Sequence, residues 1–231
     1  MAQDGRQARW NHHNQQRRCT ILTAALQVIE EAPAGAEFHV QQIAARAGLN
    51  RTVVYRHFTD RADLDAAIRA EVIESLQSTL RPVVSLEGTA DEIILRIIST
   101  YVEWTVAHQA LHAFAVLDAN GPFQQGIDQI AALLSDLIAL AVELLGVDLD
   151  ERERALVDPL AHGLVGAVVG AVRPWLAREV REPSSARMSQ LLSMAVWTLL
   201  DGHLRRLGVS LDPGRPLSEA LDRSGALRTG R

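Results

Sequence analysis

The side chains best suited to chemistry gather in one short stretch, Arg51–Phe58, which reads RTVVYRHF. If this stretch is a helix, Val54 and Phe58 lie one turn apart and can pack inward. The opposite face then carries the polar side chains Arg51, Thr52, Tyr55, Arg56 and His57. Guanidinium, hydroxyl and imidazole groups on an exposed helix can bind phosphates and base edges in the major groove of DNA. The same pattern also fits a solvated helix that binds nothing, so the residue types alone leave both interpretations open.

A second short helix is expected immediately before this stretch. Its apolar residues recur at helical spacing and define one buried face, made of Val40, Ile43, Ala44 and Ala47. Gly48 ends it, because glycine readily adopts the left-handed conformation that closes many helices. Asn50 is then the expected N-cap of the following helix. The region therefore predicts two short helices joined by a tight turn.

The stretch from Phe38 to Leu64 resembles, almost position by position, the helix-turn-helix of the TetR family of transcriptional repressors. The residues that carry the resemblance are Ile43-Ala44, Ala47-Gly48, Tyr55-Arg56-His57-Phe58, Arg61 and Leu64. It covers roughly residues 17–65 at the level of motifs, and the rest of the chain by length and helical layout only. Two positions depart from the family pattern. Arg61 stands where the family usually has lysine, and His39 stands where a threonine usually caps the second helix.

The resemblance implies a set of DNA contacts at matching positions. These are Gln41, Arg51, Thr52, Val53, Tyr55, Arg56, His57 and Arg61. Arg51 and Arg56 are long enough to reach a guanine edge or a phosphate, whereas Tyr55 is expected to bind phosphate. Arg17 and Arg18 stand near the start of the first helix, where the helix dipole helps them to meet a phosphate. The expected partner is double-stranded DNA with a two-fold related site.

Composition and charge agree with DNA contact at one end of the chain. Residues 1–60 hold seven arginines and five acidic residues, a charge of +2, whereas residues 61–231 hold sixteen arginines and 23 acidic residues, a charge of −7. Aromatic residues make up 4% of the 231 residues, and alanine and leucine abound, which favours helices. The expected fold class is all-α, with about nine helices in a three-helix N-terminal domain and a helical C-terminal domain.

Five segments follow from the patterns of breaks and apolar repeats. They are a flexible basic arm at 1–14, the helix-turn-helix domain at 15–60, a linking helix at 61–82, a ligand-binding and dimerisation domain at 83–207, and a peripheral tail at 208–231. The arm could reach a minor groove or be a disordered tail.

The cellular setting is expected to be the cytoplasm. Cys19 is the only cysteine, which excludes an intrachain disulfide and favours a reducing compartment; we expect it to be a small buried residue. Residues 1–16 are polar, so no signal peptide is expected, and no apolar run reaches the ~18 residues of a membrane span.

The resemblance also implies a small-molecule pocket in the C-terminal domain, whose occupation moves the linking helix. The candidate lining residues are Trp104, His108, Phe114, Asp118, Phe123, Leu137, His162, Val165, Val169 and Arg173. Inward positions there are mostly aliphatic, so the expected effector is lipophilic. Arg173 could favour an anionic head group or could extend to solvent.

Two helices at 151–179 and 184–207 are too apolar for the surface of a monomer, which predicts a homodimer. The expected interface residues are Leu160, Leu164, Val168, Ala171, Trp175, Trp197, Leu200 and Leu204.

Two other functional classes compete with a DNA-binding regulator. His108 and His112 lie four residues apart and could share a metal, but no third ligand has a diagnostic spacing, so no metal or cofactor is expected. No nucleophile elbow, phosphate loop or HExxH motif supports an all-helical enzyme, and no catalytic residue is expected. A helical interaction module that does not bind DNA is the remaining alternative.

Overall fold

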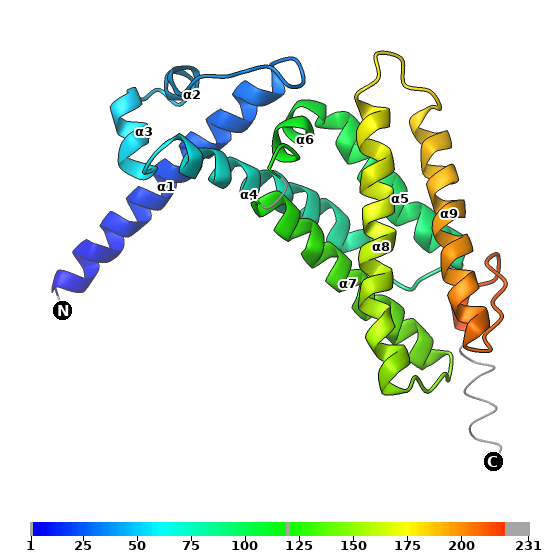
Figure 1. Ribbon diagram of the computed structural model, residues 1–231. Coiled ribbons are helices and arrows are strands. Elements are labelled where there is room, and N and C mark those ends of the chain that lie inside the picture. The colour runs from blue at the N-terminus through cyan, green and yellow to red at the C-terminus, as the bar shows by residue number, and fades with distance from the viewer. Residues whose placement is uncertain (1, 119–120, 220–231) are drawn as a thin grey trace. The chain divides into compact units, whose positions relative to one another are not determined.

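The computed structural model describes residues 2–118 and 121–219, which fold into nine α-helices and one short 3-10 helix (Figure 1). The helices in chain order are α1 (Ala2–Glu30), α2 (Val40–Arg46), α3 (Arg51–His57), α4 (Arg61–Leu80), η1 (Arg81–Val83), α5 (Ala90–Ala107), α6 (Gln109–Ala115), α7 (Pro122–Leu144), α8 (Glu151–Leu176) and α9 (Ser185–Arg206). The all-α class and the expected number of helices are confirmed.

The chain divides into two compact units. The first comprises residues up to 75 together with 108–126, and the second comprises 76–107 together with residues from 127 onward. The division falls inside α4 and inside α7, so the backbone of each of these helices contributes to both units.

The first unit is built from α1, α2, α3 and α6 together with residues 61–75 of α4 and residues 122–126 of α7. Its core contains the fully buried side chains of Ile21, Ile43, Val54, Phe58 and Leu64. The apolar spacing in the sequence predicted that Ile21, Ile43, Val54 and Phe58 face inward, and all four are buried.

The first helix begins earlier than the sequence indicated. The segment 1–14 was expected to be a flexible arm, but the backbone is helical from Ala2 onward. Alanine, glutamine and arginine all favour helix, and proline is missing from the segment, so the helix extends without an apolar stripe. Cys19, expected to be buried, is exposed on this helix.

Local capping explains where α4 begins. The Asp63 backbone N–H donates to Asp60 Oδ1 at 2.8 Å, and the Thr59 backbone N–H donates to Asp63 Oδ2 at 2.8 Å. The two carboxylates thus satisfy backbone donors at the helix start, where the dipole also favours negative charge.

The second unit is built around α5, which packs against both α8 and α9. Its helices begin at capping residues: Thr89 and Glu92 bond to each other's backbone N–H at α5, as do Asp150 and Glu153 at α8. Figure 1 shows α8 and α9 as neighbouring helices joined by a loop at one end.

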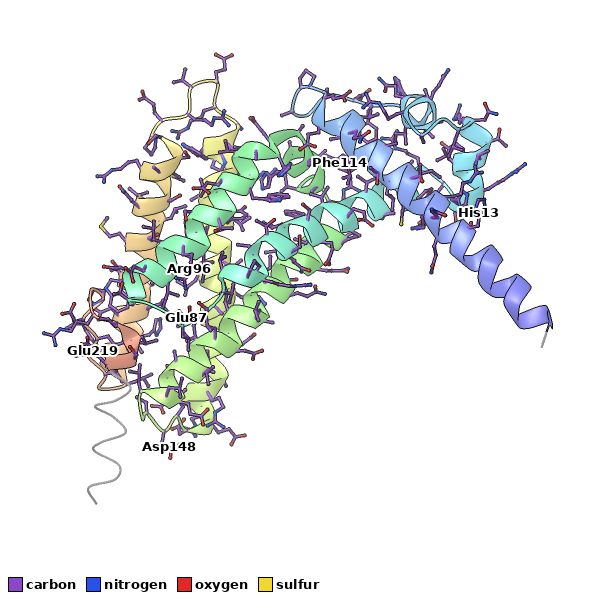
Figure 2. The ribbon with its side chains drawn as sticks, turned by 180° about the vertical axis from the view of Figure 1, so that it is seen from behind. His13, Glu87, Arg96, Phe114, Asp148 and Glu219 are labelled. Atoms are coloured by element: carbon purple, nitrogen blue, oxygen red, sulfur yellow. The ribbon has the colours of Figure 1, made fainter. Side chains whose placement is uncertain are left out.

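Arg96 fixes the loop that enters α5 (Figure 2). Its guanidinium donates to the carbonyl oxygens of Val83 at 3.0 Å, Ser85 at 3.1 Å and Glu87 at 3.2 Å. One arginine therefore supplies hydrogen bonds to three carbonyl oxygens that are not paired within a helix.

The segment after α9 was expected to be peripheral, but part of it packs into the second unit. The backbone N–H of Leu217 donates to the Gly88 carbonyl oxygen at 3.0 Å, and the Leu217 side chain is buried. An isolated bridge between Thr89 and Pro216 holds the same segment beside the start of α5.

α8 also differs from the expectation that no segment resembles a membrane span. In the part of the chain that the structure describes, α8 is long and apolar enough for one, with a mean hydropathy of 1.7 over its best window. Only 28% of that window is buried within the chain. Length and composition alone do not distinguish a membrane from another apolar partner as the cover for this helix.

Candidate DNA-binding surface and ligand cavity

The turn between α2 and α3 sets the orientation of the polar helix. Gly48 adopts a φ of +66°, which only glycine reaches without strain, and the chain then enters α3 at Asn50. Val54 and Phe58 are 0% and 1% exposed, so they anchor α3 to the first unit. Asn50 is the N-cap residue as expected, although its side chain makes no capping hydrogen bond.

Anchoring those two residues turns the polar side of α3 outward. Arg51, Thr52 and Arg56 are exposed, as is Gln41 on α2. Val53, Tyr55 and His57 are half-buried at the margins of the same face. The guanidinium of Arg51 lies over the Tyr55 ring, 5.5 Å from its centre, so the two side chains pack against each other on this polar face.

Arg18 holds the C-terminal end of α3. Its Nη1 donates to the His57 carbonyl oxygen at 2.9 Å, and its guanidinium lies 4.2 Å from the centre of the Phe58 ring. A cation at this position satisfies a terminal carbonyl and complements the negative end of the helix dipole. Much of the Arg18 guanidinium that the sequence suggested for phosphate is therefore engaged inside the protein.

Arg61 is engaged in a similar way. Its Nε donates to Asp65 at 2.8 Å, its Nη1 donates to the Phe38 carbonyl oxygen at 3.1 Å, and its guanidinium lies 4.5 Å from the Phe38 ring. The planar, multiply donating guanidinium allows this bridge between α4 and the segment before α2. Here the arginine differs from the lysine usual in the family, since an ammonium cannot make the same set of contacts.

The electrostatic state of His57 follows from its surroundings. Burial lowers the pKa of the His57 imidazole, and the positive charges of Arg17 and Arg18 lower that pKa further. At neutral pH the ring is therefore uncharged. It can still donate one hydrogen bond to a phosphate, but not as a cation.

An ion pair that the sequence did not suggest braces α2. Arg46 at the end of α2 pairs with Glu31, which follows α1, through two hydrogen bonds. The pairing lowers the pKa of the Glu31 carboxyl. The two residues are 15 positions apart, so no helical periodicity in the sequence could reveal the contact.

The second unit contains a cavity of about 210 Å³. It lies among α5, α7, α8 and α9, and the segment after α9 contributes to its wall. The lining residues are Leu80, Leu86, Ala90, Ile93, Ile94, Ile97, Ile98, Tyr101, Ile127, Ile130, Leu134, Leu137, Ile138, Ala141, Val142, Leu145, Ala161, Leu164, Val165, Val168, Val169, Val196, Trp197, Leu200, Leu204, Leu211 and Leu217.

Only part of the expected lining set meets at this cavity. Leu137, Val165 and Val169 line it. His108, Phe114, Asp118 and Phe123 belong instead to the first unit. The reason is that the helix is interrupted at His108, which separates α5 from α6, and the residues of α6 lie outside the second unit.

These four residues form contacts of their own, and the Phe123 ring packs edge-on against His112 with ring centres 5.9 Å apart. His108 pairs with Glu30 of α1, and the Phe114 ring packs edge-on against Phe38 at 5.3 Å. Asp118 lies 3.9 Å from Arg69. His108 and His112 were expected to share one helical face. Instead His108 is the N-cap residue of α6 and His112 lies inside that helix, so they do not. In the described residues no group of three or more metal-ligating side chains comes together.

The remaining expected ligand residues also lie away from the cavity wall. Trp104 is buried in the second unit without lining the cavity, and Arg173 is exposed. His162 faces Asp158 one turn earlier in α8, with Nδ1 3.0 Å from its carbonyl oxygen.

The expected dimer residues mostly face the interior of the second unit. Five of them line the cavity: Leu164, Val168, Trp197, Leu200 and Leu204. Trp175 is 2% exposed, and its Nε1 donates to the Pro183 carbonyl oxygen at 2.8 Å. Leu160 and Ala171 are half-buried.

The exposed apolar faces of α8 and α9 are formed by residues other than the expected dimer residues. On α8 they are Leu156, Pro159, Gly163, Gly166, Ala167, Gly170 and Pro174, and on α9 they are Leu191, Met194, Ala195, Leu199 and Gly202. Leu156 and Met194 are 64% and 65% exposed. A helix that is apolar all round does not reveal which side faces its own subunit, and this explains the difference.

Comparison with known proteins agrees with this architecture. Residues 21–68 match the sequence model of bacterial regulatory proteins of the tetR family. The chain is 28% identical over 207 residues to the HTH-type transcriptional regulators MT0489 and Rv0472c of two Mycobacterium tuberculosis strains, CDC 1551 / Oshkosh and H37Rv. The alignment covers 86% of this chain and 83% of each relative.

Solved structures share the fold at low sequence identity. A tetR-family transcriptional regulator from Streptomyces coelicolor superposes with a TM-score of 0.65 and 18% identity, over 91% of this chain and 99% of that one. RolR, solved in complex with resorcinol, superposes with a TM-score of 0.61 and 16% identity, over 93% and 95% of the two chains. The chain belongs to the TetR family and is a transcriptional regulator with a DNA-binding helix-turn-helix domain.

Proposed function

We propose that this regulator is a repressor that binds a two-fold related operator as a homodimer and leaves it when a small apolar effector fills the cavity of the second unit. The observation that carries the proposal is the outward polar face of α3 on two fully buried anchors, Val54 and Phe58. A helix fixed in this way presents its side chains to a major groove as a unit. Such a repressor acts in the cytoplasm and performs no catalysis.

The proposed roles of the DNA-contact residues depend on whether each side chain is exposed or already bonded to other groups of the protein. Arg51 and Arg56 are exposed and long enough for a bidentate contact with guanine. Thr52 and Gln41 reach nearby base edges or phosphates, and Val53 offers its methyl groups to a thymine. Tyr55 and His57 supply hydrogen-bond donors to the phosphate backbone. Arg17 remains a candidate for a phosphate, whereas Arg18 and Arg61 act mainly by holding α3 and α4 in place.

Selection from random duplexes, followed by binding measurements on the selected sequence, tests this assignment. Arg51→Ala and Arg56→Ala should each weaken the selected site by about 1–3 kcal/mol and relax its base preference. Wild-type protein that selects no sequence, and whose binding does not depend on salt, would support a helical interaction module instead.

The effector proposal rests on the cavity. A wall almost entirely of aliphatic side chains favours a lipophilic ligand, because polar groups would lose their hydrogen bonds to water there. RolR, which shares the fold, binds the small aromatic molecule resorcinol. A ligand releases DNA only if it prefers the conformation that does not bind DNA. α4 and α7 are suited to transmit this preference, because each contributes residues to both units.

The dimer proposal rests on the exposed apolar stripes of α8 and α9. A Cβ added at Gly163, Gly166 or Gly170 would meet no atom within 4 Å apart from the adjoining backbone of α8 itself, so this stripe is open and lined by small residues. Small residues allow close approach of a second helix, and most of the apolar window of α8 lacks cover within the chain. A second copy of α8 and α9 is therefore the proposed cover.

Gly166→Arg tests the dimer, with Ala132→Arg on the exposed side of α7 as the matched control. Both variants should fold, since each adds a charge at an exposed helical position. Light scattering should report monomers for Gly166→Arg and dimers for the control. Dimers in both variants would contradict the proposed interface.

A further inference from the structure

The wall of the cavity is unusually poor in groups that could bond to a ligand. Among its lining side chains, the only polar atoms are the Tyr101 hydroxyl and the Trp197 indole nitrogen. No lining residue carries a charge. A ligand inside this cavity must therefore be uncharged, because an ion would lose its hydration with no opposite charge to replace it.

The Tyr101 hydroxyl is buried without a partner. The residue is 5% exposed, its Oη is covered from solvent, and no hydrogen-bonding group of the described residues is in reach. Burial also raises the pKa of this phenol far above its ordinary value, so the group stays neutral and keeps its proton. Buried hydroxyls nearly always have a partner, and one without a partner destabilises the protein.

The size of the cavity restricts the ligand further. An apolar cavity of ~150 Å³ takes up benzene. By comparison, the cavity of about 210 Å³ suits a molecule of roughly eight to ten non-hydrogen atoms.

We propose that the effector is a small, uncharged hydrocarbon that carries one oxygen, and that this oxygen accepts a hydrogen bond from the Tyr101 hydroxyl. This inference rests on the cavity being the effector site. Tyr101 of α5 shares the cavity wall with Ile97 and Ile98 of the same helix and with Leu134 and Leu137 of α7. Rotation of these aliphatic side chains can admit an oxygen to the hydroxyl without exposing it to water.

The proposal excludes several ligand classes. A carboxylate has no cation to meet, since Arg173 is exposed and lies outside the wall. A sugar or a diphenol brings several hydroxyls to a wall whose only buried, unpartnered donor is the Tyr101 hydroxyl, and each unpaired hydroxyl weakens binding. The expected specificity therefore differs from that of RolR, which binds resorcinol.

The test uses four probes of similar size: cyclooctanone, cyclooctane, octanoate and resorcinol. Each is titrated by calorimetry into the full-length wild-type protein and into Tyr101→Phe, without DNA. Tyr101→Phe removes one oxygen and keeps the ring, so the cavity keeps its shape. Cyclooctanone should bind the wild type at least tenfold more tightly than the variant, whereas cyclooctane should bind both within about twofold. Octanoate and resorcinol should bind the wild type at least tenfold more weakly than cyclooctanone.

Two results would overturn the inference: equal affinity of cyclooctanone for wild type and variant, or octanoate binding as tightly as cyclooctanone. The melting temperature without ligand checks that the variant is folded, and it should equal or exceed that of the wild type. Release of a selected duplex, measured separately, distinguishes this inference from the proposed function. If cyclooctanone binds through Tyr101 but releases no DNA, the ligand assignment holds and the repressor mechanism fails. If cyclooctane alone binds and releases DNA, the mechanism holds and the role of Tyr101 fails.

Discussion

In the first unit, α4 and α7 approach closely at Ile73 and Gly126. The effect of Gly126→Ala on the free energy of unfolding should therefore depend on which side chain stands at position 73. A Cβ added at Gly126 would lie 2.0 Å from Cγ1 of Ile73 and 3.0 Å from its Cδ1. Overpacking of this kind destabilises a core by about 1–3 kcal/mol, and replacing a helical glycine with alanine returns about 1 kcal/mol. Gly126→Ala alone should therefore be destabilising by up to about 2 kcal/mol.

The same substitution should be stabilising when Ile73 is alanine. Ile73→Ala alone should lower the free energy of unfolding by about 2–5 kcal/mol, because it leaves a cavity. It also removes Cγ1 and Cδ1 and leaves only the Cβ of residue 73, which lies 3.2 Å from the added Cβ. The cavity left by Ile73→Ala gives room for the small shift that this contact needs, so adding Gly126→Ala should then raise the free energy of unfolding by up to about 1 kcal/mol. Urea unfolding of the four proteins, followed by circular dichroism, measures the cycle. Additive effects would show that α4 and α7 do not approach each other at this point.

Two further predictions concern the DNA-binding unit. Arg17→Gln should reduce the slope of log affinity for duplex against log salt by about 0.9, the loss of one phosphate contact, whereas Arg18→Gln should leave that slope unchanged. Arg18→Gln should instead lower the unfolding free energy by about 1–2 kcal/mol, since it removes the bond to the His57 carbonyl; an unchanged stability with a reduced slope would reverse the roles. Because the pKa of His57 is lowered on folding, the unfolded chain binds the extra proton below about pH 6.5, and stability should fall as the pH decreases from there. Urea midpoints should show a smaller acid loss for His57→Gln than for the wild type, and equal losses would refute the assigned shift.

The sequence predicted the DNA-binding unit well because that unit depends on local patterns. Val54 and Phe58 are buried one helical turn apart, and Gly48 ends the preceding helix with a positive φ. Spacing along the chain is sufficient to identify such residues. The roles of Arg18 and Arg61 were less predictable, because their partners His57 and Phe38 are distant in sequence.

The cavity and the interface were harder to predict for a different reason. α8 is apolar on nearly all sides, so periodicity could not separate Leu164, which lines the cavity, from Gly166, which is exposed. The helix is interrupted at His108, where α6 begins to pack against α1. As a result, four of the residues expected to bind ligand belong to the first unit. The isolation of the Tyr101 hydroxyl is a property of the packed core and has no signature in the sequence.

The central claim is that filling the cavity of the second unit weakens DNA binding by the first unit. Fluorescence anisotropy of a labelled duplex carrying the selected sequence tests this claim directly. The duplex is titrated with the protein in the presence of a saturating concentration of whichever of the four probes raises the melting temperature most. Coupling between two sites commonly amounts to about 5–150-fold in affinity, and we predict a rise in the Kd for the duplex within this range. A duplex Kd that stays unchanged while the same probe saturates and stabilises the protein would contradict the account.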